Sequence, residues 1–326
     1  MKGNRYKILI TGGAGFIGSN LVEHFLNLDF DVICLDDLCT GFEHNIDHYF
    51  NDSRFTFIKG DIRNFSICKK AVQGCDYVLH QAALGSVPRS IKDPINTNSV
   101  NIDGFLNVLV ASRDENIKRF VYAASSSTYG DSKKLPKLED EIGKPLSPYA
   151  ITKYANELYA DVFATTYGMK CIGLRYFNVF GKRQDPDSAY SAVIPLWIKK
   201  LIKHESPTVN GDGSISRDFT YIDNVVQANY LAIQTENQTA FNTVYNTAYG
   251  EQNTLNELLQ YLKELLSMYD SEIMDIEIKY GPKRTGDIEH SHASIEKARQ
   301  LLNYIPKYSL RDGLKETINW YYENLS

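Results

Sequence analysis

Long apolar runs are missing from this 326-residue sequence. A helix that crosses a bilayer needs roughly 18 or more consecutive apolar residues, and no segment approaches that length. The first apolar stretch ends at Thr11 after a few residues, which is too short for the core of a signal peptide. We therefore expect a cytoplasmic protein that does not associate with membranes.

An excess of positive charge is missing as well. Lysines and arginines number 35 against 40 aspartates and glutamates, so the formal net charge is −5. Proteins that bind nucleic acids usually carry net positive charge or a basic stripe. We expect no nucleic-acid partner, and any phosphate recognition should depend on a few well-placed groups.

Paired cysteines and linkers are also absent. The five cysteines are odd in number and form no Cys-x-x-Cys pair, so we expect neither a disulfide framework nor a metal site. No internal repeat, low-complexity tract or proline-rich linker divides the chain. Its parts should therefore pack closely against one another.

The first half of the chain alternates short β-branched segments with amphipathic ones. Segment 7–10 is apolar and stops at a glycine-rich turn, whereas the apolar residues between 17 and 26 recur at helical spacing. This alternation predicts an α/β fold with a doubly wound parallel sheet. The predicted strands are 7–10, 32–35, 55–58, 77–80, 119–123 and 171–174, and 102–112 is one of the predicted helices.

Beyond about residue 175 the pattern changes to separate helices with short strands between them. We expect one domain over residues 1–175 and a smaller α/β domain over residues 176–326, with a cleft between them. Some segments of the second half are expected to rejoin the first sheet. The predicted helices are 193–203, 224–234, 254–267 and 311–324, with Asp223, Asn253 and Ser309 as N-caps.

A glycine motif follows the first predicted strand and opens a helix. Gly12, Gly15 and Gly18 allow a tight turn in which a pyrophosphate can approach the backbone amides at the helix N-terminus. Asp36 ends the second strand, where a carboxylate accepts the ribose hydroxyls of an adenosine. That carboxylate would repel a 2′-phosphate, and no arginine is close to it in sequence, so NAD is favoured over NADP.

A phenol and an ammonium stand one helical turn apart after Ser147, which could cap that helix. Tyr149 and Lys153 occupy positions i and i+4, so they share one helix face. A phenol is a poor base at neutral pH unless a nearby cation lowers its pKa. Ser125, Ser126 and Ser127 follow the fifth strand, where hydroxyls point into the ligand crevice.

Together these motifs resemble the extended short-chain dehydrogenase/reductase family, and within it the bacterial UDP-N-acetylglucosamine 4-epimerases of surface-polysaccharide pathways. The resemblance covers nearly the whole chain. It implies a Rossmann-type doubly wound sheet that binds NAD over residues 1–175 and a UDP-sugar-binding domain over residues 176–326. The matching segments are Thr11–Gly18, Asp61–Arg63, His80–Ser90, Asn98, Ser125–Gly130, Tyr149 with Lys153, Arg175–Gly181, Asn210–Gly213, Arg217–Phe219, Asp223 and Arg284 with Asp287.

The resemblance implies a catalytic role for three residues. Tyr149 is expected to remove the proton from the sugar 4-hydroxyl while NAD takes the hydride from carbon 4. Ser125 is expected to hydrogen-bond the same oxygen, and Lys153 to hold the nicotinamide ribose and lower the pKa of Tyr149. The 4-keto sugar then turns and accepts the hydride on its other face, so the reaction is redox-neutral.

The resemblance also implies the binding residues. Arg217 and Arg284 are expected to hold the diphosphate, because a guanidinium can bind phosphate oxygens in bidentate fashion. Ser291, four positions after Asp287, is small enough to leave room for an acetamido group on carbon 2. The cofactor residues implied are Gly12, Gly15, Phe16, Ile17, Gly18, Asp36, Gln81, Ala82, Ala83, Asn98, Tyr149, Lys153 and Tyr176, with Asp61 and Ile62 at the adenine. The substrate residues implied are Ser86, Arg89, Ser126, Ser127, Asn178, Arg217, Arg284 and Ser291, with Ala192, Val193, Ile194 and Asn210 at the uracil and Asp287 at the uridine ribose.

Other reactions on the same fold fit the residues less well. A 4,6-dehydratase needs an adjacent Asp-Glu pair after the catalytic hydroxyl, and a sugar-acid decarboxylase needs a glutamate there, whereas Ser126 and Ser127 follow Ser125. UDP-glucose stays open as a substrate, and so do UDP-N-acetylglucosaminuronic acid and UDP-glucuronic acid. For these two uronic acids, His290, Arg89 and Ser86 could meet the carboxylate at carbon 6. A non-catalytic NAD-binding regulator is a remote alternative, and a homodimer is implied by the resemblance alone.

Overall fold

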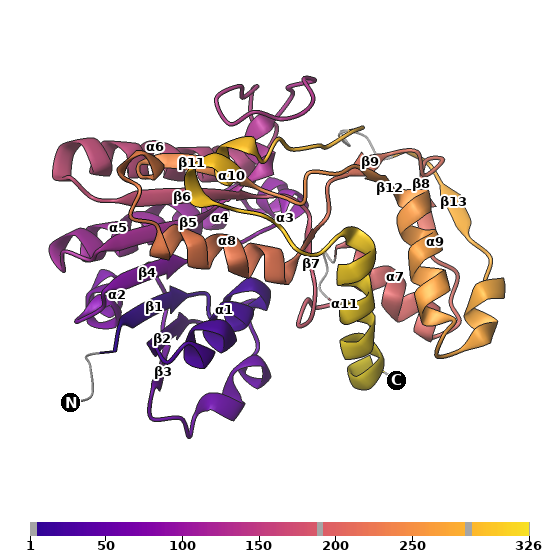
Figure 1. Ribbon diagram of the computed structural model, residues 1–326, viewed down its shortest axis with the longest axis horizontal. Helices are drawn as coiled ribbons and strands as arrows, with labels where there is room; N and C mark the ends of the chain where they lie inside the picture. The colour runs from indigo at the N-terminus through magenta and orange to yellow at the C-terminus, as the bar shows by residue number, and fades with distance from the viewer. Residues whose placement is uncertain (1–4, 188–191, 284–288, 326) are drawn as a thin grey trace.

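The computed structural model describes residues 5–187, 192–283 and 289–325. In this part of the chain a seven-stranded parallel sheet has the order β11-β6-β5-β4-β1-β2-β3 (Figure 1). The order reverses between β1 and β4, and such a point opens a crevice at the carboxyl ends of the strands. The strands are β1 (Lys7–Thr11), β2 (Asp31–Asp36), β3 (Phe55–Lys59), β4 (Tyr77–His80), β5 (Arg119–Ser125), β6 (Cys171–Tyr176) and β11 (Thr243–Thr247).

Helices cover both faces of this sheet, which confirms the predicted doubly wound fold. Ile8 and Ile10 of β1 pack into the core that includes one pair of helices, α1 and α8. Leu9 lies between them and points into the core on the opposite face. The helices are α1 (Phe16–Asn27) and α8 (Ile222–Gln234) on one face, and α2 (Phe65–Val72), α5 (Gly104–Asp114) and α6 (Pro148–Tyr167) on the other.

The second half of the chain forms a smaller α/β part, drawn to the right in Figure 1. Some of its segments return to the sheet: β11 pairs with β6, and α8 packs against α1. Its own helices are α7 (Val193–Ile202), α9 (Leu255–Leu266) and α11 (Leu310–Leu325), whereas α10 (Glu296–Leu302) packs against β11 and α8. Short parallel or antiparallel pairs join β7 (Val179–Phe180) to β10 (Thr220–Tyr221), β8 (Thr208–Asn210) to β13 (Lys279–Gly281), and β9 (Ser216–Arg217) to β12 (Asn253–Thr254).

Short helical segments connect these elements. Ser99–Asp103 is a π-helical turn continuous with α5, so the predicted helix 102–112 begins earlier than expected. Among the helices of the described residues, none is long and apolar enough to cross a membrane. The remaining short elements are α3 (Val87–Lys92), α4 (Pro94–Asn98), η1 (Glu43–Asn45), η2 (Asp47–Tyr49), η3 (Ser99–Asp103), η4 (Ser126–Tyr129), η5 (Gln238–Ala240) and η6 (Ser271–Asp275).

Two of the predicted N-caps are wrong. The helix α8 begins at Ile222, so Asp223 lies in its first turn instead of capping it. Thr254, not Asn253, caps α9, because Thr254 and Glu257 form a reciprocal capping box that satisfies two backbone donors. The cap at Ser309 is confirmed, since its Oγ accepts the backbone N–H of Asp312 at 3.2 Å.

A buried ion pair fixes α6 to the sheet. The guanidinium of Arg175 on β6 donates to both carboxylate oxygens of Glu157 on α6, at 2.9 and 2.7 Å. The two side chains are only 3% and 7% exposed. Because a bidentate pair has one preferred geometry, this contact sets the position of the helix that carries Tyr149 and Lys153.

Candidate active site

The glycine turn at the carboxyl end of β1 packs closely against the end of β4 and leads into α1. Gly12 has a φ of +68°, and a Cβ on it would lie 2.8 Å from the backbone of Ala82. Gly15 precedes α1 without a side-chain cap, so no side chain blocks the first amides of that helix. These features fit the expected pyrophosphate site at a helix N-terminus.

Asp36, at the end of β2, is held toward this turn by two backbone donors. Its Oδ2 accepts the N–H of Ala14 at 3.0 Å and its Oδ1 accepts the N–H of Leu38 at 2.8 Å. Burial raises the pKa of Asp36, and the two amides oppose that rise. A carboxylate has about four acceptor positions, so the oriented group can still accept the ribose hydroxyls of a dinucleotide.

A pocket of about 390 Å³ lies beside the glycine turn and Asp36. It brings together most of the residues that the sequence predicted for the cofactor, from the carboxyl ends of four strands, β1 to β4. Those residues are Gly12, Gly15, Phe16, Ile17, Gly18, Asp36, Ile62, Gln81, Ala82 and Ala83. Its lining also includes residues that were not predicted, namely Leu35, Asp37, Cys39, Thr40, Gly60, Gly85, Val100, Val179 and Gln184.

Five predicted cofactor residues do not line this pocket: Tyr149 and Lys153, which are described below, and three others. The carboxylate of Asp61 is bound by the guanidinium of Arg63, with Nε–Oδ2 and Nη2–Oδ2 distances of 2.8 and 2.6 Å. Asn98 is exposed at the end of α4. Tyr176 lies behind the lining, where its hydroxyl donates to Gln81 Oε1 at 3.1 Å. A direct contact of these three with the cofactor stays a prediction.

Tyr149 and Ser125 meet at the carboxyl end of β5. The Tyr149 hydroxyl is hydrogen-bonded to Ser125, and this bond lowers the pKa of Tyr149, while burial has the larger, opposite effect and raises it. Ser127 Oγ donates to Ser125 Oγ at 2.8 Å. The three hydroxyls therefore form a chain that can carry a proton toward or away from the reacting oxygen.

Lys153 follows Tyr149 on the same face of α6 and is 2% exposed. Its Nζ donates to the carbonyl oxygen of Ala123 at 2.8 Å. Burial lowers the pKa of Lys153 to about 8, against the influence of Glu157. The expected lowering of the Tyr149 pKa by Lys153 is not found among the protein's own groups, because burial and the Ser125 bond are the causes that act on that phenol.

A second pocket, of about 270 Å³, adjoins the first, and Val179 lines both. The N-terminus of α7 opens onto it, and Ala192 there makes no side-chain cap. A helix N-terminus with an arginine beside it favours an anion. The predicted substrate residues in its lining are Asn178, Ala192, Val193, Ile194, Asn210 and Arg217, and apolar residues including Phe180, Trp197, Ile215, Phe219 and Leu255 complete it.

The other predicted substrate residues that the structure describes do not line the second pocket. Ser291 donates its backbone N–H to Ser216 at 3.1 Å, so it lies next to Arg217 of the second pocket. Ser86 caps α3 by accepting the N–H of Arg89 at 3.1 Å. Ser126 and Ser127 form the half-buried turn after Ser125. Arg284 and Asp287 lie outside the described residues.

The chain is similar to known sugar-nucleotide enzymes over nearly its full length. The model of the NAD dependent epimerase/dehydratase family matches residues 8–248. A solved UDP-N-acetylglucosamine 4-epimerase from Methanobrevibacter ruminantium, in complex with UDP-N-acetylmuramic acid, is 37% identical with a TM-score of 0.91, covering 98% of this chain and 99% of the other. A UDP-glucose 4-epimerase from Thermotoga maritima with UDP-glucose is 35% identical with a TM-score of 0.89, covering 98% and 100%. A UDP-glucuronic acid 4-epimerase from Bacillus cereus, with its substrate and NAD, is 31% identical with a TM-score of 0.87, covering 97% and 99%.

The carboxylate of Asp36 generates a testable prediction about the cofactor. Asp36→Ala should weaken NAD binding by roughly 10-fold or more, since hydrogen bonds to a charged group are worth about 1.5–3 kcal/mol. It should also reduce the preference for NAD over NADP. Calorimetric titration of both dinucleotides into protein stripped of cofactor measures both effects.

Asp31→Ala, at the other end of β2, is the matched control and should bind NAD normally. Unchanged NAD affinity in Asp36→Ala, with NADP still excluded, would show that Asp36 does not recognise the ribose.

Proposed function

The chain belongs to the NAD dependent epimerase/dehydratase family, and on that premise we propose that it is a UDP-N-acetylhexosamine 4-epimerase. The reaction would interconvert UDP-N-acetylglucosamine and UDP-N-acetylgalactosamine through a 4-keto sugar. The observation that carries the proposal is the hydroxyl chain of Ser127, Ser125 and Tyr149, which stands at the strand ends that also carry the nucleotide pocket.

In the proposed mechanism, NAD supplies an acceptor for the hydride of carbon 4. Tyr149 Oη takes the proton of the 4-hydroxyl, because Ser125 donates to it and stabilises the phenolate. Lys153 holds the nicotinamide ribose. Arg217 and the α7 N-terminus would keep the diphosphate bound while the keto sugar turns, so that carbon 4 can receive the hydride on its other face.

The residues around Ser125 favour epimerisation over elimination. Removing water from carbons 5 and 6 requires an acid and a base beside the catalytic hydroxyl. Ser126 and Ser127 occupy the two following positions, and both are uncharged. A purely regulatory NAD-binding protein has no need of the Ser125–Tyr149 contact or of a buried Lys153, and both are present here.

The choice of an acetylated sugar rests on Ser291. Its backbone N–H donates to Ser216, the residue before Arg217, and Arg217 lines the second pocket. A small side chain there leaves space for an acetamido group on carbon 2. UDP-glucuronic acid or its N-acetylated counterpart is the second candidate, since Arg89 and Ser86 meet at the start of α3 and could bind a carboxylate.

We also propose that the enzyme is a homodimer. Apolar side chains of α6 are exposed along one stripe: Ile151, Leu158 and Val162 have exposed fractions of 55%, 51% and 52%. Ile91 of α3 and Ile95 of α4 extend this surface, at 63% and 83% exposure, and both helices contact α6. Contiguous apolar patches of this kind commonly mark protein interfaces.

Light scattering should therefore report the mass of two chains. Leu158→Glu should shift the protein toward one chain, because it places a charge in the middle of the apolar stripe, whereas Ile305→Glu, on an exposed apolar residue outside it, should not. A monomeric wild type would contradict the dimer.

The proposed reaction is tested by incubation with UDP-N-acetylglucosamine and separation of the two epimers. Tyr149→Phe should lower turnover by at least about 10²-fold, the usual scale for loss of a general base, and should leave NAD bound. Tyr167→Phe, at the far end of α6, is the control and should turn over normally. Near-normal turnover in Tyr149→Phe would remove the assignment of the base.

Ser291→Tyr tests the substrate class. Overfilling a packed site costs about 1–3 kcal/mol, so turnover of UDP-N-acetylglucosamine should fall by roughly 10-fold or more. UDP-glucose, which lacks the acetamido group, is the internal control and should be affected much less. Equal loss with both sugars would mean that Ser291 does not read the group on carbon 2.

A further inference from the structure

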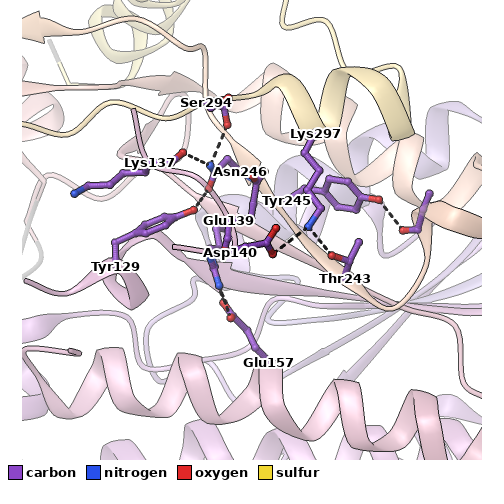
Figure 2. A network of polar contacts seen from close by, with 12 residues as sticks. Tyr129, Lys137, Glu139, Asp140, Glu157, Thr243, Tyr245, Asn246, Ser294 and Lys297 are labelled. Atoms are coloured by element: carbon purple, nitrogen blue, oxygen red, sulfur yellow. Dashed lines mark hydrogen bonds and ion pairs between the residues drawn. The ribbon is translucent and has the colours of Figure 1, made fainter. Parts of the chain in front are cut away.

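Asn246 is a fully buried amide in the middle of β11, where apolar side chains are usual. Its exposed fraction is 0%. Its Oδ1 accepts the hydroxyl proton of Tyr129 at 2.6 Å, and its Nδ2 donates to the carbonyl oxygens of Lys137 and Ser294 at 2.9 and 3.0 Å (Figure 2). Its backbone N–H donates to Glu139 Oε1 at 2.9 Å.

These bonds join segments that carry different parts of the site. Tyr129 ends the turn that begins after Ser125, so it belongs to the catalytic side. Ser294 belongs to the segment that carries Ser291, on the sugar side. The side chain of Asn246 bonds directly to both segments, through Tyr129 and Ser294.

The segment around Lys137 strengthens this junction. The backbone N–H of Lys137 donates to the carbonyl oxygen of His292 at 2.7 Å, and the Lys137 carbonyl accepts the N–H of Ser294 at 3.0 Å. The same carbonyl is also one of the two acceptors for Asn246 Nδ2. The wall next to Ser291 is therefore paired with a neighbouring loop, and Asn246 fixes the pair to the sheet.

A second path leads from Asn246 to the catalytic helix. Glu139, whose carboxylate accepts the Asn246 N–H, offers its backbone carbonyl to Arg175 at 2.7 Å. The guanidinium of Arg175 in turn donates to the carboxylate of Glu157 on α6 (Figure 2). A buried polar network in which every member is satisfied resists distortion, because each displaced group would be left without a partner.

We propose that Asn246 is a positioning residue for sugar recognition: it sets the distance between the Ser291 wall and the catalytic hydroxyls of Ser125 and Tyr149. This inference rests on the proposed function. It predicts that loss of the Asn246 bonds weakens the contribution of the sugar to binding, while the uridine diphosphate, held by Arg217 and α7, binds as before.

A purely structural role predicts a different outcome. If Asn246 only stabilised the fold, its replacement would lower the melting temperature and reduce binding of every ligand in proportion to the folded fraction. The ratio of affinities for UDP and UDP-N-acetylglucosamine in the folded protein would not change. That ratio is the readout that separates the two roles.

The experiment is calorimetric titration of the NAD-loaded protein with UDP and with UDP-N-acetylglucosamine, alongside melting curves. Asn246→Leu removes all three side-chain bonds. Tyr129→Phe removes one of them and keeps the ring, so it provides a folded variant if Asn246→Leu does not fold. Lys297→Met is the control, because Lys297 bonds to Thr243 and Asp140 at the edge of the same network without contacting Asn246.

We expect the affinity ratio to fall about tenfold in Asn246→Leu, the scale of about one hydrogen bond lost between the protein and the sugar, and by less in Tyr129→Phe. Lys297→Met should keep the wild-type ratio. An unchanged ratio in both network variants would overturn the positioning role and leave the proposed function intact. If the wild type bound UDP but no UDP-sugar, the proposed function would fail, and this inference with it.

Discussion

Burial of the Tyr149 hydroxyl is the constraint on which the chemistry of this site depends. Burial keeps water from the reacting oxygen, but it also raises the pKa of the phenol that must lose a proton. Ser125 lowers that pKa in part, and Lys153 is engaged by the carbonyl of Ala123. In the proposed mechanism, the phenol would need further positive charge nearby, and the nicotinamide ring of oxidised NAD would supply that charge when bound.

The same constraint explains the arrangement of the two pockets. A keto sugar must stay inside the site while it turns, so the diphosphate has to be held by groups that do not take part in the proton transfer. In the proposed reaction, Arg217 and the α7 N-terminus would provide this hold in the second pocket. Val179 lines both that pocket and the cofactor pocket. The return of β11 and α8 to the central sheet ties both pockets to one rigid support.

Local sequence signals predicted the parts of this structure that are themselves local. The apolar strands, the glycine turn with Asp36, and the pair Tyr149 and Lys153 each follow from spacing within one or two neighbouring elements. An asparagine such as Asn253 is a favoured N-cap residue. The reciprocal hydrogen bonds between Thr254 and Glu257 nevertheless determine where α9 begins.

Contacts between distant segments could not be predicted in this way. Gln184 lines the cofactor pocket from a loop far along the chain. Asp61 has the residue type and position of an adenine contact, yet Arg63, two residues on, binds its carboxylate. Asp218 is fully buried and accepts the N–H groups of Tyr249, Gly250 and Ala293. Asp218 lies among polar residues, after Ser216 and Arg217, so its sequence neighbourhood does not mark it as buried.

In the proposed reaction, carbon 4 of the sugar loses and regains the same hydrogen without exchange with water. This claim is tested most directly with UDP-N-acetylglucosamine carrying deuterium at carbon 4, incubated with the enzyme in ordinary water and without added cofactor. The account predicts that both epimers at equilibrium keep the deuterium at carbon 4. Loss of the label to solvent, or epimerisation that requires added nicotinamide cofactor in stoichiometric amounts, would contradict it.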